Sequence, residues 1–588
     1  MFTDVDACAL ISDLDLITQE LGRFRRIYRG ILATLAAPEL AAAVAEAEQI
    51  LTPLLEASAY AEARLAADAD DETGAEVLDH CERLWSRVAS TWDFFEPELA
   101  RSRAEDASHA TELDRHRNYL ARLRASATFQ PAEPVASVMA GLDPVPAWET
   151  LARQMLARIR PGGEPLGAVL PALYAPDVEF RRRRADDVSS ALLAEVDLRA
   201  SVLGGLAQAR AARAEVSGAR DWAHAERVAN QVDDRDLAAL LETVRGSLGT
   251  VHRYYSWKRT ALGHPLSDSD RYAPLPGSPG GHSWELTREV VLEAFRRIGG
   301  RVADVAAELL DSGAVDAFPR QRKTRGALTF GLPSGRVAVL LNFTGVQRDV
   351  LTLAHELGHA AHLRLAVGRG AFTATAPTVL GETVALFTES VAADVLAERA
   401  DDATARVALT ARTVEDRLVA VFRQVVLHDF EDWLHTAGGR SERLDAESLA
   451  ERWIEGQRRL YGDAIQLTDG YRHWWSYLDE LFLRPGGRFA YPYGQLAAMA
   501  LAARFRETPS SFRPRFESLL SAGASAPPAE LLGELGVHPD DPCSWQEGVD
   551  ALIAQVDALR ADRPDKRSDD RLSPSFTRAE HNQEVITP

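Results

Sequence analysis

The residues His355-Glu356-Leu357-Gly358-His359 place two imidazoles four positions apart, with a carboxylate beside the first. In an α-helix, residues four positions apart lie on the same face, so both rings can bind one metal ion. The intervening glutamate can then take a proton from water held at the metal. The residue types and their spacing predict metal-assisted hydrolysis, and zinc is the ion that this pattern typically binds.

The surrounding sequence predicts the helix that this spacing requires. Apolar residues recur at helical intervals from Val346 to Leu365, after capping chemistry in residues 342–345 and before two glycines. A pair of histidines packed in a core is the alternative. It would leave Glu356 as an unpaired carboxylate in an apolar segment, which is costly.

A catalytic zinc usually takes three protein ligands and leaves its fourth position to water, so a third donor is needed. Glu382 is the candidate, because it lies in a second segment whose apolar residues have helical spacing. Glu389 follows on the same predicted face. It either orients His355 or His359 by accepting a ring N–H, or it is an ordinary solvated glutamate. His362, one turn beyond His359, is expected to support packing.

Two short runs predict a β-hairpin just before this helix. They cover residues 327–330 and 336–341 and are separated by Gly331-Leu332-Pro333-Ser334-Gly335. Elsewhere, Ala- and Leu-rich helical patterns dominate.

Several further stretches share their residues with one family of enzymes. They are residues 254–258, 270–276, 326–333, 339–345, 348–350, 474–477, 519–523, 530–532 and 535–536. With the paired histidines, they resemble the oligoendopeptidase F family of thimet-like zinc metallopeptidases, from about residue 178 to residue 557. The resemblance implies that His355, His359 and Glu382 bind zinc and that Glu356 is the general base.

The same resemblance implies a fold and a class of substrate. The expected fold is mostly α, a multi-lobed helical metallopeptidase with a small β-sheet beside the motif helix and a deep channel between the lobes. Such a channel would limit substrates to short, unstructured peptides.

The segment that follows Trp474 departs from the family, which carries histidine and several tyrosines there to steady the oxyanion of the tetrahedral intermediate. Reading without gaps, the positions of expected histidines and tyrosines hold Glu480, Leu483, Gly487 and Phe489. Tyr491 keeps its place and Tyr493 lies close by, so these two are the candidate catalytic tyrosines. Three other residues could substitute as hydrogen-bond donors: Arg484, Arg488 and His473. For each of them, a surface or packing role is the alternative.

The composition of the chain limits which binding partners and which cellular compartment we expect. The 588 residues carry a formal net charge of −21, which opposes binding to nucleic acid or to an anionic membrane. No signal-like start and no run of 18 apolar residues occur, so we expect a cytoplasmic protein. Cys8, Cys81 and Cys543 lack metal-ligand spacing and are expected to fill the core. The four arginines at 181–184, flanked by acidic residues, predict a solvated helix face.

Breaks in the helical patterns divide the chain into four segments. We expect an N-terminal helical lobe in residues 1–125, interrupted in the acidic stretch 68–74, and a connecting helical region in 126–195. Residues 196–560 form the expected zinc metallopeptidase catalytic region. The charged tail 561–588 has few apolar residues and is expected to be disordered.

The sequence therefore favours a zinc-dependent endopeptidase that acts on short peptides. Because family histidines and tyrosines are missing after Trp475, a second hypothesis is a zinc-binding relative with weak hydrolysis, acting as a peptide-binding or pathway-specific processing protein. A third is a helical scaffold without metal, which requires the spacing of His355 and His359 to be coincidental.

Overall fold

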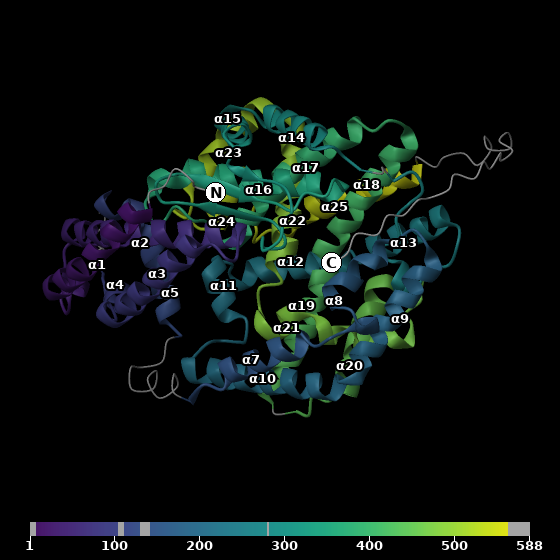
Figure 1. The fold of residues 1–588 in the computed structure, drawn as a ribbon, viewed down its shortest axis with the longest axis horizontal. Coiled ribbons are helices and arrows are strands. Elements are labelled where there is room, and N and C mark those ends of the chain that lie inside the picture. Colours follow the sequence, from purple (N-terminus) through teal and green to yellow (C-terminus); the bar gives the residue numbers. More distant parts are fainter. Residues whose placement is uncertain (1–6, 104–110, 130–141, 279–280, 441, 562–588) are drawn as a thin grey trace.

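The fold is built almost entirely from α-helices (Figure 1). The computed structural model describes residues 7–103, 111–129, 142–278, 281–440 and 442–561. The mostly α fold with a small β-sheet is confirmed. The expected disordered tail lies, from residue 562 onward, outside the described residues. Within the described ranges, no helix combines the length and the apolar character needed to cross a membrane.

The first helices gather at one end of the molecule (Figure 1). They are α1 (Ala7–Tyr28), α2 (Ala37–Ala67), α3 (Glu72–Thr91), α4 (Phe95–Arg101) and α5 (Arg117–Ala127). They bury a hydrophobic core of their own, which includes Leu54 and Trp92. The break predicted in residues 68–74 is confirmed, and Asp71 caps α3 by accepting a hydrogen bond from the Gly74 N–H. The division of the whole chain into four segments stays a prediction.

The rest of the body packs around two larger cores. Its helices before the sheet are α7 (Val145–Leu156), α8 (Leu166–Val169), α9 (Val178–Ala194), α10 (Val196–Ser217), α11 (His224–Asn230), α12 (Asp234–Gly246), α13 (Gly249–Leu262), α14 (Trp284–Ile298) and α15 (Gly300–Asp311). Those after the sheet are α16 (Gln347–Ala366), α17 (Thr378–Glu398), α18 (Ala403–Leu418), α19 (Gln424–Gly439), α20 (Ala446–Tyr461), α21 (Asp479–Leu483), α22 (Ala490–Glu507), α23 (Pro509–Ala522), α24 (Pro528–Gly533) and α25 (Pro542–Ala561).

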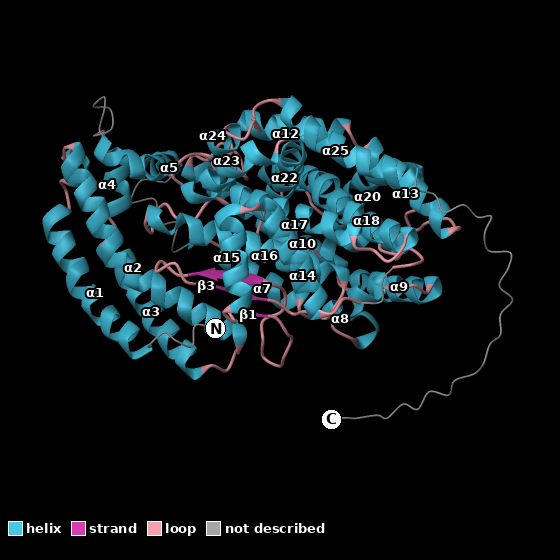
Figure 2. Ribbon diagram, turned by 90° about the horizontal axis from the view of Figure 1, so that it is seen from above, coloured by secondary structure: helices cyan, strands magenta, loops and turns pink. Residues whose placement is uncertain are grey.

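The predicted hairpin is present, and a third strand joins it. Strands β2 (Leu328–Gly331) and β3 (Val337–Leu340) pair antiparallel, while β1 (Val315–Asp316) pairs parallel to β3, giving the order β1-β3-β2. Helix α16 packs against β2 and β3, which Figure 2 shows as the magenta strands beside α15 and α16. The end of α2 also contacts this sheet, where Phe330 packs near Ala66 and Ala67. The sheet therefore joins the N-terminal helices to the motif helix.

Helix α16 starts where the sequence predicts, but its cap differs from the expected one. Asn342 uses its amide to donate to the carbonyls of Thr324 and Gly326. The cap comes from inside the helix, where the Asp349 carboxylate accepts from the N–H groups of Thr344 and Gly345 at 2.6 and 2.9 Å. A carboxylate in the first turn also complements the helix dipole.

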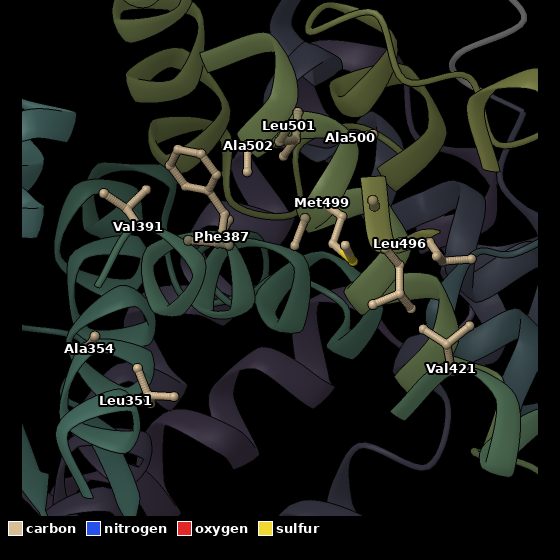
Figure 3. Packing of buried hydrophobic residues seen from close by; sticks show 14 of the residues in the cluster. Leu351, Ala354, Phe387, Val391, Val421, Leu496, Met499, Ala500, Leu501 and Ala502 are labelled. Carbon is tan, nitrogen blue, oxygen red and sulfur yellow. The ribbon is translucent and has the colours of Figure 1, made fainter. Parts of the chain in front are cut away.

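Helix α17 lies between α16 and α22 and is held close to both. Gly358 allows the first approach: a Cβ placed there would lie 2.4 Å from Thr388 Oγ1 and 2.9 Å from Ala385 Cα. The Thr388 hydroxyl donates to the Ala354 carbonyl at 2.8 Å. Gly494 allows the second approach, because its Cβ would lie 3.0 Å from Glu382 Cβ. The apolar side chains that meet here from the three helices include Leu351, Ala354, Phe387, Val391, Leu496 and Ala502 (Figure 3).

Two smaller predictions are wrong in part, although Arg182 and Arg183 are exposed as expected. Arg181 is buried rather than solvated, because its guanidinium forms an ion pair with Asp270 at 2.6 Å and donates to the Ala175 carbonyl. The cysteines are not all core residues: Cys81 is buried, whereas Cys543 is exposed.

The approach at Gly358 gives a stability prediction. Gly358→Ala should lower the free energy of unfolding by about 1–3 kcal/mol, because the added methyl group forces α16 and α17 apart. Denaturant unfolding followed by circular dichroism measures this. Gly368→Ala is the matched control, since nothing lies within 4 Å of the added Cβ and the residue is exposed. Equal stability of the two variants would contradict the proposed tight approach.

Candidate metal centre

Three side chains from α16 and α17 bring their donor atoms to one point. The Nε2 atoms of His355 and His359 lie 3.2 Å apart. The Glu382 carboxylate places Oε2 3.6 Å from the first ring and Oε1 3.6 Å from the second. The ligand atoms of these three residues all lie within 4.8 Å of one another, so the group could hold a metal ion. The juxtaposition expected from the sequence is therefore present in the fold.

The two imidazoles have different electrostatic surroundings. Burial lowers the pKa of His359 to about 3, helped by the neighbouring rings of His355 and His362. A ring kept neutral keeps its nitrogen lone pair for a metal. Burial also acts against the charged form of His355, but the contact with Glu389 and the charges of Glu389 and Glu382 outweigh it and raise the pKa.

The carboxylate of Glu389 contacts His355, and the guanidinium of Arg348 contacts that carboxylate in turn. Glu389 Oε2 lies 3.3 Å from His355 Nδ1, and Glu389 Oε1 accepts a hydrogen bond from Arg348 at 3.2 Å. Glu389 is 9% exposed, so the alternative of a solvated glutamate is wrong. Although burial opposes its charge, Arg348 and His355 lower the pKa of Glu389. The sequence left the choice between His355 and His359 open, and the structure places Glu389 beside His355.

Glu356 is held by the first hairpin strand. The Thr329 hydroxyl donates to Glu356 Oε2 at 2.7 Å and also lies 3.0 Å from the Glu356 carbonyl oxygen. The carboxylate is nearly buried, and its pKa is raised because burial disfavours the charge, although the Thr329 hydrogen bond acts in the opposite direction. A carboxylate with a raised pKa beside a donor cluster is suited to accept and return a proton.

A pocket of about 440 Å³ opens beside this carboxylate. His355 and Glu356 line it together with Gly326 and Ala327, which precede β2, and with Asn342 and Arg348. Strand β2 is at the edge of the sheet, so its outer side has no strand partner among the described residues. The pocket therefore lies between His355 and Glu356 on one side and the residues that lead into β2 on the other.

A second cavity, of about 860 Å³, lies by the start of α22. Tyr491, Glu480, Arg488 and Thr378 are among its lining residues. The Tyr491 hydroxyl donates to Glu480 Oε1 at 3.0 Å, and burial together with the Glu480 charge raises its pKa to about 12. Tyr491 precedes Gly494 by three positions, so both lie on the helix face that approaches Glu382.

The structure separates the two candidate tyrosines. Tyr491 is 43% exposed, whereas Tyr493 is fully buried with its ring 4.9 Å from that of Trp545. The Tyr493 hydroxyl contacts no hydrogen-bond partner among the described residues. Residues two positions apart on an α-helix point to nearly opposite sides, so Tyr491 and Tyr493 cannot both face the cavity. The buried position of Tyr493 does not support a catalytic role.

The other donor candidates are engaged elsewhere. Arg488 is buried between Glu431 and Glu480, at 3.0 and 2.8 Å. Arg484 is mainly exposed and lies 3.8 Å from Asp479. His473 lies in the 3₁₀ segment Asp469–Tyr477, where its neighbours include Arg472 and Glu447.

Sequence reasoning missed Thr329 and Arg348 as parts of the site. Thr329 lies in the predicted hairpin and Arg348 in the first turn of the predicted helix, so their nearness to the motif was detectable. Their side-chain directions required the register of β2 on β3 and the packing of α16 on α17. His362 is buried and outside the donor group, in agreement with a packing role.

Comparison with known proteins gives the same relatives as the sequence motifs. Residues 300–551 match the model of peptidase family M3. An oligoendopeptidase F homologue of Borreliella burgdorferi is 23% identical over 340 residues, which cover 56% of this chain and 57% of that protein. The oligopeptidase PepF of Bacillus subtilis is 24% identical over 318 residues, 53% of this chain and 47% of that protein. The chain thus spans about half the length of these relatives.

Solved structures extend the likeness of the fold to nearly the whole chain. A Chlamydophila abortus protein has a TM-score of 0.81 at 20% identity and covers 95% of this chain and 98% of its own. The oligoendopeptidase-F of Enterococcus faecium has a TM-score of 0.67 at 18% identity with the same coverage. The resemblance to oligoendopeptidases F that the motifs indicated is confirmed.

The contact behind His355 gives a prediction about metal affinity. If the three donors hold a metal ion such as zinc, Glu389→Gln should weaken its binding by about 10–100-fold, because the ring loses the charged acceptor that fixes its orientation. Competition with a chromophoric chelator measures the affinity. Glu398→Gln, on the same helix but exposed and paired with Arg297, should bind zinc as the unaltered protein does. Unchanged affinity in Glu389→Gln would remove Glu389 from the site.

Proposed function

We propose that this protein is a zinc-dependent endopeptidase that hydrolyses short, unstructured peptides. The observation that carries the proposal is the meeting of the donor atoms of His355, His359 and Glu382 within 4.8 Å, with Glu356 lining the same pocket as His355. The match of residues 300–551 to peptidase family M3 supports the reaction class.

The donor set suits zinc. Two imidazole nitrogens and one carboxylate are a usual ligand set for catalytic zinc, whereas magnesium and calcium prefer oxygen ligands alone. The ring of His359 is held neutral, which a nitrogen ligand requires. When bound here, zinc would supply a Lewis acid that polarises the peptide carbonyl and makes water a stronger acid.

Glu356 acts as the general base. Its carboxylate accepts the proton of the attacking water and then delivers it to the nitrogen of the leaving amine. Thr329 holds Oε2 in place, so the second oxygen is left for this proton transfer. Near-complete burial excludes bulk water and keeps the carboxylate sufficiently basic.

Tyr491 steadies the oxyanion. It lies on the face of α22 that approaches Glu382 and it borders the larger cavity. In the free protein its hydroxyl donates to Glu480. Because a phenol has one proton, Tyr491 must exchange this carboxylate for the carbonyl oxygen of the substrate during the reaction.

A weakly hydrolytic, zinc-binding role in peptide binding or pathway-specific processing is the second candidate. The observation that favours it is the engagement of Tyr491 by Glu480, at a position where the family carries histidine. Rapid cleavage of a mixed peptide pool would exclude this candidate.

The role of Glu356 gives the central prediction. Glu356→Gln should lower kcat by at least about 10²-fold while zinc remains bound, because the amide cannot accept a proton. Product formation from a peptide library, followed by mass spectrometry, measures turnover, and metal analysis measures zinc content.

Removal of the metal by a chelator tests the catalytic role of the metal centre without altering any residue. Removal of zinc from the unaltered protein should abolish cleavage, and added zinc should restore it. Normal turnover in Glu356→Gln, or full activity without metal, would overturn the assignment.

The two tyrosines give a matched pair of variants. Tyr491→Phe should lower kcat by about 10²–10³-fold with little change in KM, because one donor to the oxyanion is lost. Tyr493→Phe removes the same atom from a buried position without a partner and should keep both constants. Steady-state kinetics on one fluorogenic peptide compare them. Equal losses in both variants would contradict the role of Tyr491.

A further inference from the structure

We propose that Tyr272, Arg423 and Tyr477 bind a carboxylate of the peptide substrate, either its C-terminus or an acidic side chain. We call these three residues the carboxylate site. The proposal rests on the proposed peptidase function and adds a preference to it. The observation that carries it is the meeting of hydrogen-bond donors from three separate segments, none of which has a hydrogen-bonding partner among the described residues.

Arg423 ends a π-helical turn, Val419–Arg423, that lies between α18 and α19. Single π-helical turns inside α-helices are frequent at functional sites. The guanidinium forms no ion pair or hydrogen bond within the ranges that the structure describes, and its Nε is buried without a partner. The side chain as a whole is only partly buried. A guanidinium without a counter-charge in partly desolvated surroundings is costly and favours an anionic ligand.

Two tyrosine hydroxyls lie near this guanidinium. Burial raises the pKa of Tyr477, and the charge of Arg423 opposes this. Burial also acts to raise the pKa of Tyr272, but Arg271 and Arg423 outweigh it and lower the pKa. Both tyrosines are partly exposed, and neither hydroxyl donates a hydrogen bond to any described residue. Guanidinium N–H and phenol O–H groups are suitable donors to a carboxylate.

Packing on α9 holds the two tyrosines in place. Asp270, two residues before Tyr272, is fixed to α9 by its buried ion pair. The 3₁₀ segment that ends at Tyr477 is fixed to the same helix, because the Trp474 indole donates to Ser189 Oγ at 3.0 Å. The Trp474 ring lies 5.8 Å from the Tyr477 ring. The donors are therefore positioned before a ligand binds.

Positive charge is in excess around the carboxylate site. Arg271 is buried, with its Cζ 4.8 to 6.0 Å from the centres of four aromatic rings. It forms no ion pair with a described residue, and Asp268, on which its charge acts, accepts instead from a backbone N–H at 2.7 Å. Two further carboxylates, Glu415 and Asp416, are held by cations of their own at 2.6 and 3.0 Å. A carboxylate ligand would therefore neutralise charge that the fold leaves unpaired.

The carboxylate site adjoins the network that holds Tyr491. Gln424, the residue after Arg423, accepts a hydrogen bond from Arg488 at 3.1 Å. Arg488 also pairs with Glu480, the carboxylate that accepts from the Tyr491 hydroxyl. The site therefore lies close to one group of the proposed catalytic machinery.

A second set of contacts leads from the carboxylate site to the metal centre. Asp416 lies seven residues before Arg423, about 10 Å along the helix axis. It is 4.0 Å from Arg348, which lies seven residues before His355, again about 10 Å along its helix. The separation from the metal centre is thus on the order of 20 Å, which about six residues of extended peptide span. The recognised carboxylate therefore lies within about six residues of the cleaved bond.

The experiment compares pairs of fluorogenic peptides. One pair ends in a free carboxylate or in an amide, and the others carry glutamate or glutamine at one position, scanned along the peptide. The unaltered protein should cleave one carboxylate form with a kcat/KM about tenfold higher than that of its amide counterpart, as expected for one charge-assisted contact. A preference for the free C-terminus assigns the terminus, and a preference for glutamate at one position assigns a side chain; either supports the proposal.

Variants connect this ratio of kcat/KM values to the three residues. Arg423→Gln should reduce the ratio toward one. Tyr272→Phe and Tyr477→Phe should each reduce it by about threefold, because a neutral donor contributes less than a guanidinium. Arg406→Gln, the matched control, removes the same charge from an exposed position on α18 and should keep the ratio.

Arg423→Lys keeps the charge but loses the planar fork, so it should also lower the ratio. It replaces Arg423→Gln if the latter does not fold by circular dichroism. Both peptides of a pair are measured on one preparation, so the ratio does not depend on the fraction of active protein.

The outcomes separate this inference from the proposed function. If no peptide is cleaved, the peptidase function fails, and this inference fails with it. If every pair is cleaved at equal rates, or if the preference survives in all variants of Tyr272, Arg423 and Tyr477, the carboxylate site is wrong and the function stands. An equal loss in Arg406→Gln would also overturn it, because the preference would then follow net charge alone.

Discussion

The close contact between α16 and α17 is the constraint on which the site depends. A carboxylate has a short reach, so Glu382 meets two imidazoles only if the helix axes come close. Gly358 makes this possible because it lies between the two histidines and offers no side chain at the point where Ala385 and Thr388 press against α16. The Thr388 hydroxyl then uses the Ala354 carbonyl as an acceptor, which adds direction to the contact. Helix α16, which carries His355 and His359, thus also contains Gly358, the residue that allows Glu382 to come close to them.

Burial makes each charge in this region depend on its neighbours. Arg348, Glu389 and His355 form a row in which every group faces an opposite or polarisable partner, so the buried Glu389 remains charged. On the other side, Glu356 has only a hydroxyl, and its pKa rises. Two glutamates on adjacent helices therefore have opposite pKa shifts through their surroundings: the pKa of Glu389 is lowered, while that of Glu356 is raised, which suits the proton transfer proposed for it.

The sequence predicted the helix, its end and the two imidazole donors, because the helical period fixes which residues share a face. Glu382 lies on a separate helix, and it was predicted from the need for a third ligand and from the resemblance to oligoendopeptidases F. The sequence also predicted the hairpin, whose turn residues are local signals. It did not predict β1, since two residues carry no period of their own and the strand exists only through β3. The cap by Asp349 was missed because both the polar residues before the helix and a carboxylate in its first turn can supply a cap. The sequence alone does not show which of the two is used. Arg181 was misassigned because its partner Asp270 is remote in sequence. Tyr491 and Tyr493 were indistinguishable until the packing of α22 on Trp545 was known.

The segment around Glu480 shows how a departure from a family pattern can be tolerated. Glu480 shares Arg488 with Glu431, whose pKa is raised to about 7 by burial despite that guanidinium. A carboxylate that is already paired with a buried arginine is a weaker acceptor than a free one, because part of its charge is neutralised. The Tyr491 proton is therefore held by a moderated acceptor at 3.0 Å rather than by an isolated charge. In the proposed mechanism, the oxyanion develops a charge that no arginine neutralises, so the phenol gains free energy by changing partners as the charge forms. The network around Arg488 therefore holds Tyr491 in position and is compatible with the transfer of its hydrogen bond to the substrate that we propose.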